Sequence, residues 1–427
     1  MNTPLQNQWF SKARYGLFIH YGLYSVLSRG EWAWNREGIP FEDYKSLRER
    51  FSPDQFNADQ ICAFAKEMGM RYVVLTTMHH EGFRLYPTQL SDFHIGESPA
   101  KGRDLVEELV VAARKHGLKV GLYHSLNNWY DQPDAVSALE NPKAYSKFME
   151  ATHARIRELV ERYNPIDILW YDGWWPFNAE GWKGEEMNEM VRKIQPHILF
   201  NGRNGLPGDF ATPEGHLAAP KPWRPWEACM TLNNSWGYHE GDQEWKTAGQ
   251  LIDYLITCAQ GNGNLLINIG PQGSGAIPSG SMEVLTQVGN WLKKNGESIY
   301  ETEVFTLDLQ EKGEHRGEWL HHGPFTAKEK NLYWHVRRWP GGSTLAFDGL
   351  ECKVLEASLL GSGTPLKFTQ VGGRVQFTGL PEQAPDELCS VIRMTCDGSP
   401  SIYLTGGMRI PSVSHPHYDP CPSDIAH

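Results

Sequence analysis

The chain has 427 residues, of which 40% are hydrophobic and 21% charged, and its formal net charge at pH 7 is −11. This length predicts a large domain followed by a smaller one. The negative charge argues against a nucleic-acid partner, because binding to phosphates needs a basic surface. The seven cysteines are scattered and contain no CxxC pair, so they indicate neither a zinc ribbon nor a disulfide framework.

The amino-terminal stretch MNTPLQNQWFSKARYG has no basic segment followed by an apolar one. No apolar run in the chain approaches the length of a membrane span. From these two observations we expect a cytoplasmic location and no membrane partner.

Short apolar runs alternate with longer amphipathic segments from the start of the chain to about residue 300. The apolar runs predict strands buried on both faces of a parallel sheet, over 15–22, 72–80, 119–125, 167–173, 197–203 and 264–271. The amphipathic segments predict helices over 57–69, 102–117, 145–163, 184–195, 247–261 and 281–296. Repeated strand–helix units of this kind form either a doubly wound sheet or a (β/α)8 barrel.

The ends of the predicted strands favour the barrel. No glycine-rich dinucleotide or phosphate loop follows any of them, whereas polar residues recur where strand after strand ends. These residues are His20, His79, His80, His124, Asp172 and Arg203. In a barrel the carboxyl ends of the strands converge on one site. We therefore predict a (β/α)8-like TIM barrel catalytic domain over residues 1–303.

After residue 300 the pattern changes to short alternating strands with Gly, Asp and Pro turns and no helix between them. This pattern predicts a carboxy-terminal antiparallel β-sandwich over residues 304–427. The last stretch, 413–427, is rich in proline and is expected to be an extended tail.

In the stretch DILWYDGWW, residues 167–175, Asp172 lies among tryptophans and a tyrosine. The stretch has two interpretations: a strand followed by an Asp-Gly turn, or a catalytic carboxylate beside an aromatic platform. Alternate residues of a barrel strand face the interior, so Trp170 and Asp172 share a face. An acid in that place suits a nucleophile that attacks the anomeric carbon of a sugar, and the chain's 16 tryptophans suit a carbohydrate site.

Glycoside hydrolysis needs a second carboxyl group to protonate the leaving oxygen. The long loop after the fifth strand offers Asp209, Glu214 and Glu227. Glu214 lies in a Thr-Pro-Glu turn with little strand or helix character, and Glu227 is expected to be more buried. Spacing along the sequence leaves the choice between them open.

The histidines also allow a zinc site, formed by His20, His79, His80 and His124. Barrel hydrolases that use metals generally carry His-x-His on an early strand, and FIHYG has one histidine only. Neutral imidazoles suit sugar hydroxyls equally well, because each offers one donor and one acceptor. Adjacent residues such as His79 and His80 point apart within a strand, so they can share a site only where the strand ends.

Seven motifs, in order between about residues 8 and 300, resemble those of the α-L-fucosidases of glycoside hydrolase family 29. They are YGLFIHYGLYSV, YVVLTTMHHEGFRLY, GLKVGLYHS, DILWYDG, NGR…GDFATPE, WEACMTLNNSWGY and GNGNLLINIGPQGSGAIP. The resemblance implies a retaining exo-glycosidase that releases terminal α-L-fucose from oligosaccharides or glycoconjugates through a covalent fucosyl-aspartate intermediate. It implies no metal or organic cofactor, and it agrees with a carboxy-terminal β-sandwich.

The resemblance also implies roles for particular residues. Asp172 matches the nucleophile, and Glu214 matches the acid/base, with Glu227 as the alternative. The residues that match binding positions for the fucose hydroxyls and ring are His20, Glu31, Trp32, His79, His80, Tyr123, Trp170 and Arg203.

The chain departs from the family pattern at two positions. Tyr21 stands where a tryptophan is usual, and His124 stands in place of a tyrosine. Both are expected near the pocket without removing a catalytic group. Three alternatives remain: a metal-dependent barrel hydrolase, a barrel glycosidase acting on another sugar such as galactose, and a non-catalytic sugar-binding protein.

Overall fold

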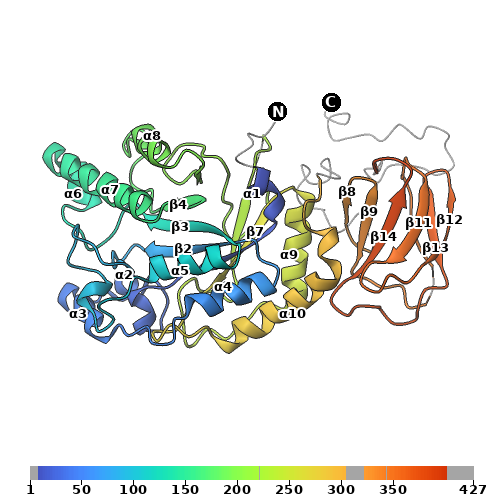
Figure 1. Ribbon diagram of the computed structural model, residues 1–427, viewed down its shortest axis with the longest axis horizontal. Helices are drawn as coiled ribbons and strands as arrows, with labels where there is room; N and C mark the ends of the chain where they lie inside the picture. Colours follow the sequence, from blue (N-terminus) through green and yellow to red (C-terminus); the bar gives the residue numbers. More distant parts are fainter. Residues whose placement is uncertain (1–7, 221, 304–321, 343, 402–427) are drawn as a thin grey trace, which may run out of the picture. The chain divides into compact units, whose positions relative to one another are not determined.

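The computed structural model describes residues 8–220, 222–303, 322–342 and 344–401 (Figure 1). The chain forms two compact units, one of residues 1–251 and 263–290 and the other of residues 252–262 and 291–427. The division expected after residue 303 stays a prediction, because residues 304–321 lie outside the described part of the chain. The proline-rich stretch 413–427, expected to be extended, also lies outside it.

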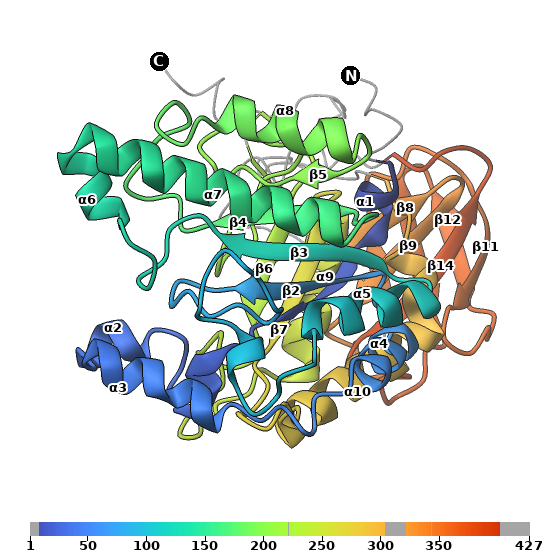
Figure 2. The same cartoon turned by 60° about the vertical axis from the view of Figure 1, so that its left-hand side comes forward.

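The first unit is built on a parallel sheet of seven strands in the order β5-β4-β3-β2-β1-β7-β6 (Figure 2). The strands are β1 (Tyr15–Ile19), β2 (Tyr72–Met78), β3 (Lys119–Ser125), β4 (Ile168–Asp172), β5 (Leu199–Phe200), β6 (Glu227–Thr231) and β7 (Asn264–Ile269). β1 to β5 follow one another in both sequence and space, and β7 returns to pair with β1. A doubly wound sheet would reverse direction partway through the chain, so the predicted barrel-like α/β architecture is confirmed.

A short segment between β5 and β6 adds pairing at the two open edges of this sheet. Phe210 forms a parallel bridge with Asn201, directly after β5, and Ala211 forms one with Trp226, directly before β6. Backbone hydrogen bonds join Asp209 N–H to the Phe200 carbonyl and Glu227 N–H to the Ala211 carbonyl. The sequence predicted only a long loop here, and the segment instead takes the place of an eighth strand.

The six predicted helices form close to their predicted ranges: α4 (Ala58–Glu67), α5 (Leu105–Lys115), α7 (Pro142–Arg162), α8 (Gly184–Ile194), α9 (Ala248–Gln260) and α10 (Ser279–Asn295). Asn57 caps α4 by accepting a hydrogen bond from Gln60 N–H. The short helix α1 (Gln8–Ala13) precedes β1, and other short helices lie in the connections: α2 (Ala33–Glu37), α3 (Phe41–Ser46) and α6 (Ala135–Glu140). None of the helices in the described ranges is long and apolar enough to cross a membrane.

Inward-facing aromatic and aliphatic side chains fill the barrel. They are Phe10, Ala13, Phe18, Tyr72, Val74, Tyr123, Ile168, Trp170, Leu199, Phe210, Cys229 and Leu266. Many of them come from alternate positions of neighbouring strands, as the two-residue period of a strand requires. This packed interior supports the polar residues at the ends of the strands.

The second unit contains two antiparallel sheets, β10-β13-β12 and β11-β14-β9-β8. Their strands are β8 (Phe325–Lys328), β9 (Asn331–Val336), β10 (Leu345–Phe347), β11 (Val354–Leu359), β12 (Lys367–Val371), β13 (Arg374–Thr378) and β14 (Ser390–Cys396). Side chains from both sheets share one core, with Trp334 and Ile392 from one and Leu345 and Phe377 from the other. The predicted β-sandwich is confirmed for the described residues.

Candidate active site

The polar residues at the ends of the parallel strands meet at one cavity of about 150 Å³. It is lined by Phe18, His20, Trp32, His79, His80, Tyr123, Trp170, Asp172, Trp174, Trp175, Arg203, Glu214, Cys229 and Trp236. Every predicted site residue except Glu31 and Glu227 is in this lining. The structure therefore brings together residues that lie nearly 200 positions apart in the sequence.

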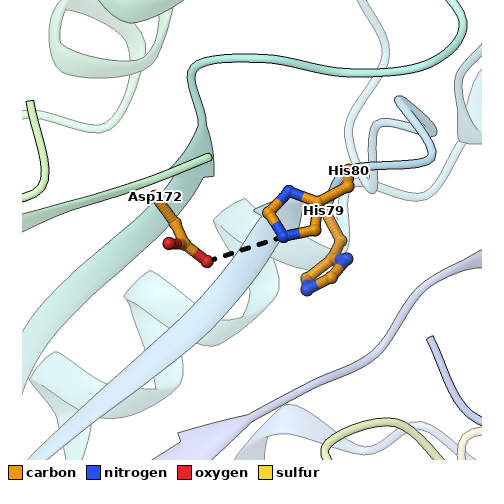
Figure 3. Close-up of side chains that lie close together, drawn as sticks. All are labelled: His79, His80 and Asp172. Atoms are coloured by element: carbon orange, nitrogen blue, oxygen red, sulfur yellow. Dashed lines mark ion pairs between the residues drawn. The ribbon is translucent and has the colours of Figure 1, made fainter. Parts of the chain in front are cut away.

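Asp172, the last residue of β4, is almost completely buried. The Tyr123 hydroxyl donates to its Oδ2 at 2.8 Å, and Nη1 of Arg203 donates to its Oδ1 at 3.0 Å. Nε2 of His80 lies 3.8 Å from Oδ2 (Figure 3). Burial by itself raises the pKa of this carboxyl, but Arg203, His80 and the hydrogen bonds outweigh burial and hold the pKa below its ordinary value. Asp172 is therefore ionised near neutral pH.

The Asp-Gly pair also makes a tight turn, as the structural interpretation of the motif predicted. Gly173 has a φ of +64°, a conformation that favours glycine. A Cβ atom at this position would lie 2.5 Å from Ser125 Oγ and 3.3 Å from His80 Nδ1. The turn thus permits the close approach of β3 and of His80 to the end of β4.

Arg203 connects the two acidic residues of the cavity. Its Nη1 contacts Asp172, and its Nη2 donates to Glu214 Oε2 at 2.7 Å. The guanidinium lies over the Trp170 ring, with Cζ 4.6 Å from the ring centroid. Because the two carboxylates bind neighbouring nitrogens of one planar group, the size of that group limits the distance between them.

Glu214 lies beside β6. It forms a parallel bridge with Cys229 of β6, and the next residue, Gly215, donates its N–H to the Cys229 carbonyl. The Glu214 side chain is 45% exposed, compared with 11% for Asp172. This bridge is isolated and lies outside the named strands, so the expectation of little strand or helix character is confirmed.

Glu227, the other candidate acid, begins β6 and is fully buried. Trp170 Nε1 donates to its Oε1 at 3.0 Å, and the Tyr72 hydroxyl donates to its Oε2. Burial raises the pKa of Glu227 to about 7. This carboxyl group lies among the side chains of the barrel interior, where it supports Trp170, and not in the lining of the cavity.

Glu31 and Trp32, adjacent in sequence, occupy different surroundings. The Trp32 ring lines the cavity, 5.3 Å from the His80 ring and stacked 6.3 Å from that of Trp175. The buried Glu31 carboxylate accepts a hydrogen bond from Gly237 N–H at 2.7 Å. Glu31 therefore holds the backbone directly after Trp236, a residue that does line the cavity.

Three histidines bring neutral imidazoles to the cavity. Burial lowers the pKa of His20, His79 and His80, and the value for His20 is about 3. β2 ends at Met78, so His79 and His80 lie after the strand and do not have to point to opposite faces of the sheet. Both of their rings line the cavity.

The ligand atoms of His79, His80 and Asp172 lie within 4.8 Å of one another (Figure 3), so these residues could hold a metal ion. Neutral imidazole and an ionised carboxylate are suitable ligands for zinc. The Arg203 guanidinium bonded to Asp172 opposes a cation there, because it places a positive charge beside the same carboxylate.

The two positions that depart from the family pattern do not line the cavity. Tyr21 packs against Phe51 and Phe56 and donates its hydroxyl proton to the Gly273 carbonyl. His124 is buried on the opposite face of β3 from Tyr123, since alternate residues of a strand face opposite ways. Both residues are next to cavity residues in the sequence, but neither side chain is part of the lining.

Sequence reasoning did not select five residues of the lining. They are Phe18, Trp174, Trp175, Cys229 and Trp236. The two-residue period of β1 could have indicated Phe18, which shares a face with His20. Trp236 follows β6 in the chain and lies 5.0 Å from the His20 ring, a proximity that no local pattern indicates.

A family model described as alpha-L-fucosidase matches residues 2–297. The plasma alpha-L-fucosidase of Homo sapiens is 33% identical over 423 residues, covering 88% of this chain and 85% of that protein. Alpha-L-fucosidase isoenzyme 1 from Paenibacillus thiaminolyticus has a similar structure, with a TM-score of 0.83 and 34% identity over 92% of this chain and 99% of that one. A family 29 enzyme from Bacteroides thetaiotaomicron, trapped as a covalent intermediate with 2-fluoro-fucosyl fluoride, gives a TM-score of 0.81 at 27% identity, covering 92% of this chain and 97% of that one.

These relatives contradict the cytoplasmic location expected from the sequence, since the matched human enzyme is named for plasma. That expectation was wrong because it rested on the lack of a signal at the start of the chain. Signal segments are removed from mature proteins, so such a lack does not indicate a compartment.

Proposed function

The chain belongs to the α-L-fucosidase family of glycoside hydrolases, and on this premise we propose that it is a retaining exo-enzyme that releases terminal α-L-fucose from oligosaccharides or glycoconjugates. The observation that carries the proposal is the ionised Asp172, held by Arg203 and Tyr123 in a cavity walled by aromatic rings. At about 150 Å³ the cavity is smaller than the roughly 300–1,000 Å³ of most drug-sized ligand sites. That size favours one terminal sugar unit over a longer chain.

In the first step of this mechanism, a carboxylate oxygen of Asp172 attacks C1 of the fucosyl unit. The C1–O bond to the leaving group breaks, and Glu214 gives its proton to the departing oxygen. In the second step, Glu214 takes a proton from water, which attacks C1 and releases Asp172. Two displacements at C1 give net retention of configuration.

Access to the cavity favours Glu214 over Glu227 as the acid/base. Glu214 lines the cavity and shares the Arg203 guanidinium with Asp172. Retaining enzymes hold their two carboxyl groups roughly 5–5.5 Å apart, a separation that a shared guanidinium can impose. Both carboxyl oxygens of Glu227 accept hydrogen bonds within the barrel, from Trp170 and Tyr72.

The covalent intermediate trapped in the Bacteroides thetaiotaomicron enzyme supports the two-step mechanism for this chain. The nature of the cavity wall supports fucose as the sugar. Phe18 and Trp236 have ring centroids 6.0 Å apart, and both flank His20. An apolar surface of this kind suits the methyl group of a 6-deoxy sugar better than a hydroxymethyl group.

The test compares hydrolysis of p-nitrophenyl α-L-fucoside with that of the matching α-L-galactoside, which differs only in bearing a hydroxymethyl group in place of the methyl group at C5. We expect rapid release from the fucoside and little from the galactoside. Proton NMR of the first-formed sugar should show the α-anomer of fucose before mutarotation. Preference for the galactoside would reject fucose as the substrate, and initial release of the β-anomer would reject the retaining mechanism.

A further inference from the structure

His20 makes a hydrogen bond on its inner side to a residue outside the cavity lining. Asn268 lies on β7, at the level of Phe18 on the neighbouring strand β1. Its Oδ1 lies 2.6 Å from His20 Nδ1, and both side chains are buried. This contact sets which nitrogen of the imidazole carries a proton.

The amide of Asn268 has one favourable orientation. Its Nδ2 donates a hydrogen bond to the Trp236 carbonyl at 2.7 Å. Turning the amide over would bring two acceptor oxygens together, because a backbone carbonyl only accepts. Gly270 permits this contact, since a Cβ atom there would lie 2.8 Å from the same carbonyl oxygen. Oδ1 of Asn268 is thus directed at His20.

An amide oxygen only accepts hydrogen bonds, so His20 Nδ1 carries the proton. Burial lowers the pKa of His20 to about 3, and a neutral imidazole has one N–H group only. Nε2, at the edge of the ring away from Asn268, therefore has a lone pair. We propose that Asn268 is a positioning residue that holds His20 in this tautomer, so that His20 accepts a hydrogen bond from a sugar hydroxyl. This inference deepens the proposed function and rests on it.

The second unit contains a comparable pair of hydrogen bonds, which predicts the opposite tautomer for His335. The Thr326 hydroxyl donates to the Ser298 carbonyl at 2.7 Å and lies 2.9 Å from His335 Nε2. The hydroxyl has one proton, which goes to the carbonyl, so His335 Nε2 must donate. His335 is buried and its pKa is also lowered to about 3, which leaves Nδ1 bare. His335 is therefore an internal control in the same molecule.

The first measurement is ¹⁵N NMR of the histidine-labelled full chain without substrate, with signals assigned through His20→Gln and His335→Gln. We expect the far-downfield shift of a bare nitrogen at Nε2 of His20 and at Nδ1 of His335. A protonated Nε2 on His20 would overturn the inference. Because no fucoside is present, this result is independent of whether the chain hydrolyses one.

The second measurement is the pH profile of fucoside hydrolysis by Asn268→Asp. The charges that face His20 are Asp172 and Arg203, with the imidazole of His80 beside them. An added carboxylate at position 268 should raise the pKa of His20, so that both nitrogens carry protons at low pH. We expect a loss of about 5- to 100-fold in kcat/KM at low pH that recovers as the pH rises.

Asn268→Ala provides a variant without the new charge, and should give a mixture of His20 tautomers in the same spectrum. Thr326→Val is the matched control and should alter the His335 signals alone. A loss of activity in Asn268→Asp that is equal at every pH would indicate a purely structural role and overturn the proposal. Inactivity of the wild type towards fucosides, with a bare Nε2 on His20, would reject the proposed function and leave the tautomer assignment standing.

Discussion

Two neighbouring regions of the first unit hold carboxyl groups close to tryptophan, one with a charged partner at the cavity and the other with neutral partners in the barrel interior. We call Asp172, Arg203 and Glu214 the rim, and Tyr72, Trp170 and Glu227 the interior. In the rim, an arginine joins two carboxylates that face the cavity. In the interior, neutral donors satisfy one carboxyl group that is completely enclosed.

The difference shows that residues close together on one strand can have different roles, one facing the cavity and the other supporting its wall. Glu227 and Cys229 are two residues apart on β6, yet only Cys229 lines the cavity. A cation lowers the pKa of Asp172 below its ordinary value, whereas burial without a cation in contact raises that of Glu227 to about 7. The presence of a cation in contact with the carboxyl group, more than the burial of that group, therefore distinguishes the two regions.

The largest effect expected from this comparison is at Asp172. Asp172→Asn keeps the size of the side chain but removes the nucleophile, so kcat on an aryl fucoside should fall by about 10⁴-fold or more. Asp209→Asn is the matched control, since Asp209 also pairs with an arginine, Arg192, outside the cavity. Near-native turnover by folded Asp172→Asn, judged by circular dichroism, would reject its role.

The next effect is at Glu214 and depends on the leaving group. Glu214→Gln should lower kcat by about 10²- to 10⁴-fold on a fucoside whose leaving group needs a proton. The loss should be much smaller on a dinitrophenyl fucoside, because that group departs without protonation. The comparison between rim and interior would fail if Glu227→Gln gave this pattern and Glu214→Gln did not.

A smaller effect is expected on stability at Glu227. Its pKa is raised from an ordinary 4.5 to about 7, so the folded state binds the proton more tightly than the unfolded state. This group stabilises the protein fully below pH 4.5 and loses that contribution as the pH rises through about 7. Urea midpoints of wild type should fall across this window relative to those of Glu227→Gln. Parallel curves for the two proteins would show that Glu227 does not titrate there.

The smallest effect is expected from removing metal ions. If Arg203 keeps cations from His79, His80 and Asp172, dialysis against a chelator should leave fucoside hydrolysis unchanged. Activity that is lost on chelation and restored by added zinc would favour the metal-dependent alternative. Metal analysis of the dialysed protein serves as the control for complete removal.

Much of the fold could be predicted because its signals are local. Apolar runs and amphipathic periods indicated six parallel strands and the six main helices near their observed bounds, and the sequence around Glu227 indicated the start of a further strand, β6. Because the carboxyl ends of parallel strands lie at one edge of the sheet, the sequence also predicted that His20, His79, His80, Asp172 and Arg203 share one site.

The remaining details depended on contacts between distant segments. An isolated bridge to Cys229 joins Glu214 to β6, and a hydrogen bond from Gly237 N–H gives Glu31 a supporting role. Trp236 reaches His20 across more than 200 residues of sequence. Periodicity is set by each residue's own neighbours, so the sequence by itself determined the strands, the helices and the acid at the end of β4. Which carboxyl group faces the cavity depends on packing between segments that meet only in the folded chain, and the tertiary structure alone decided it.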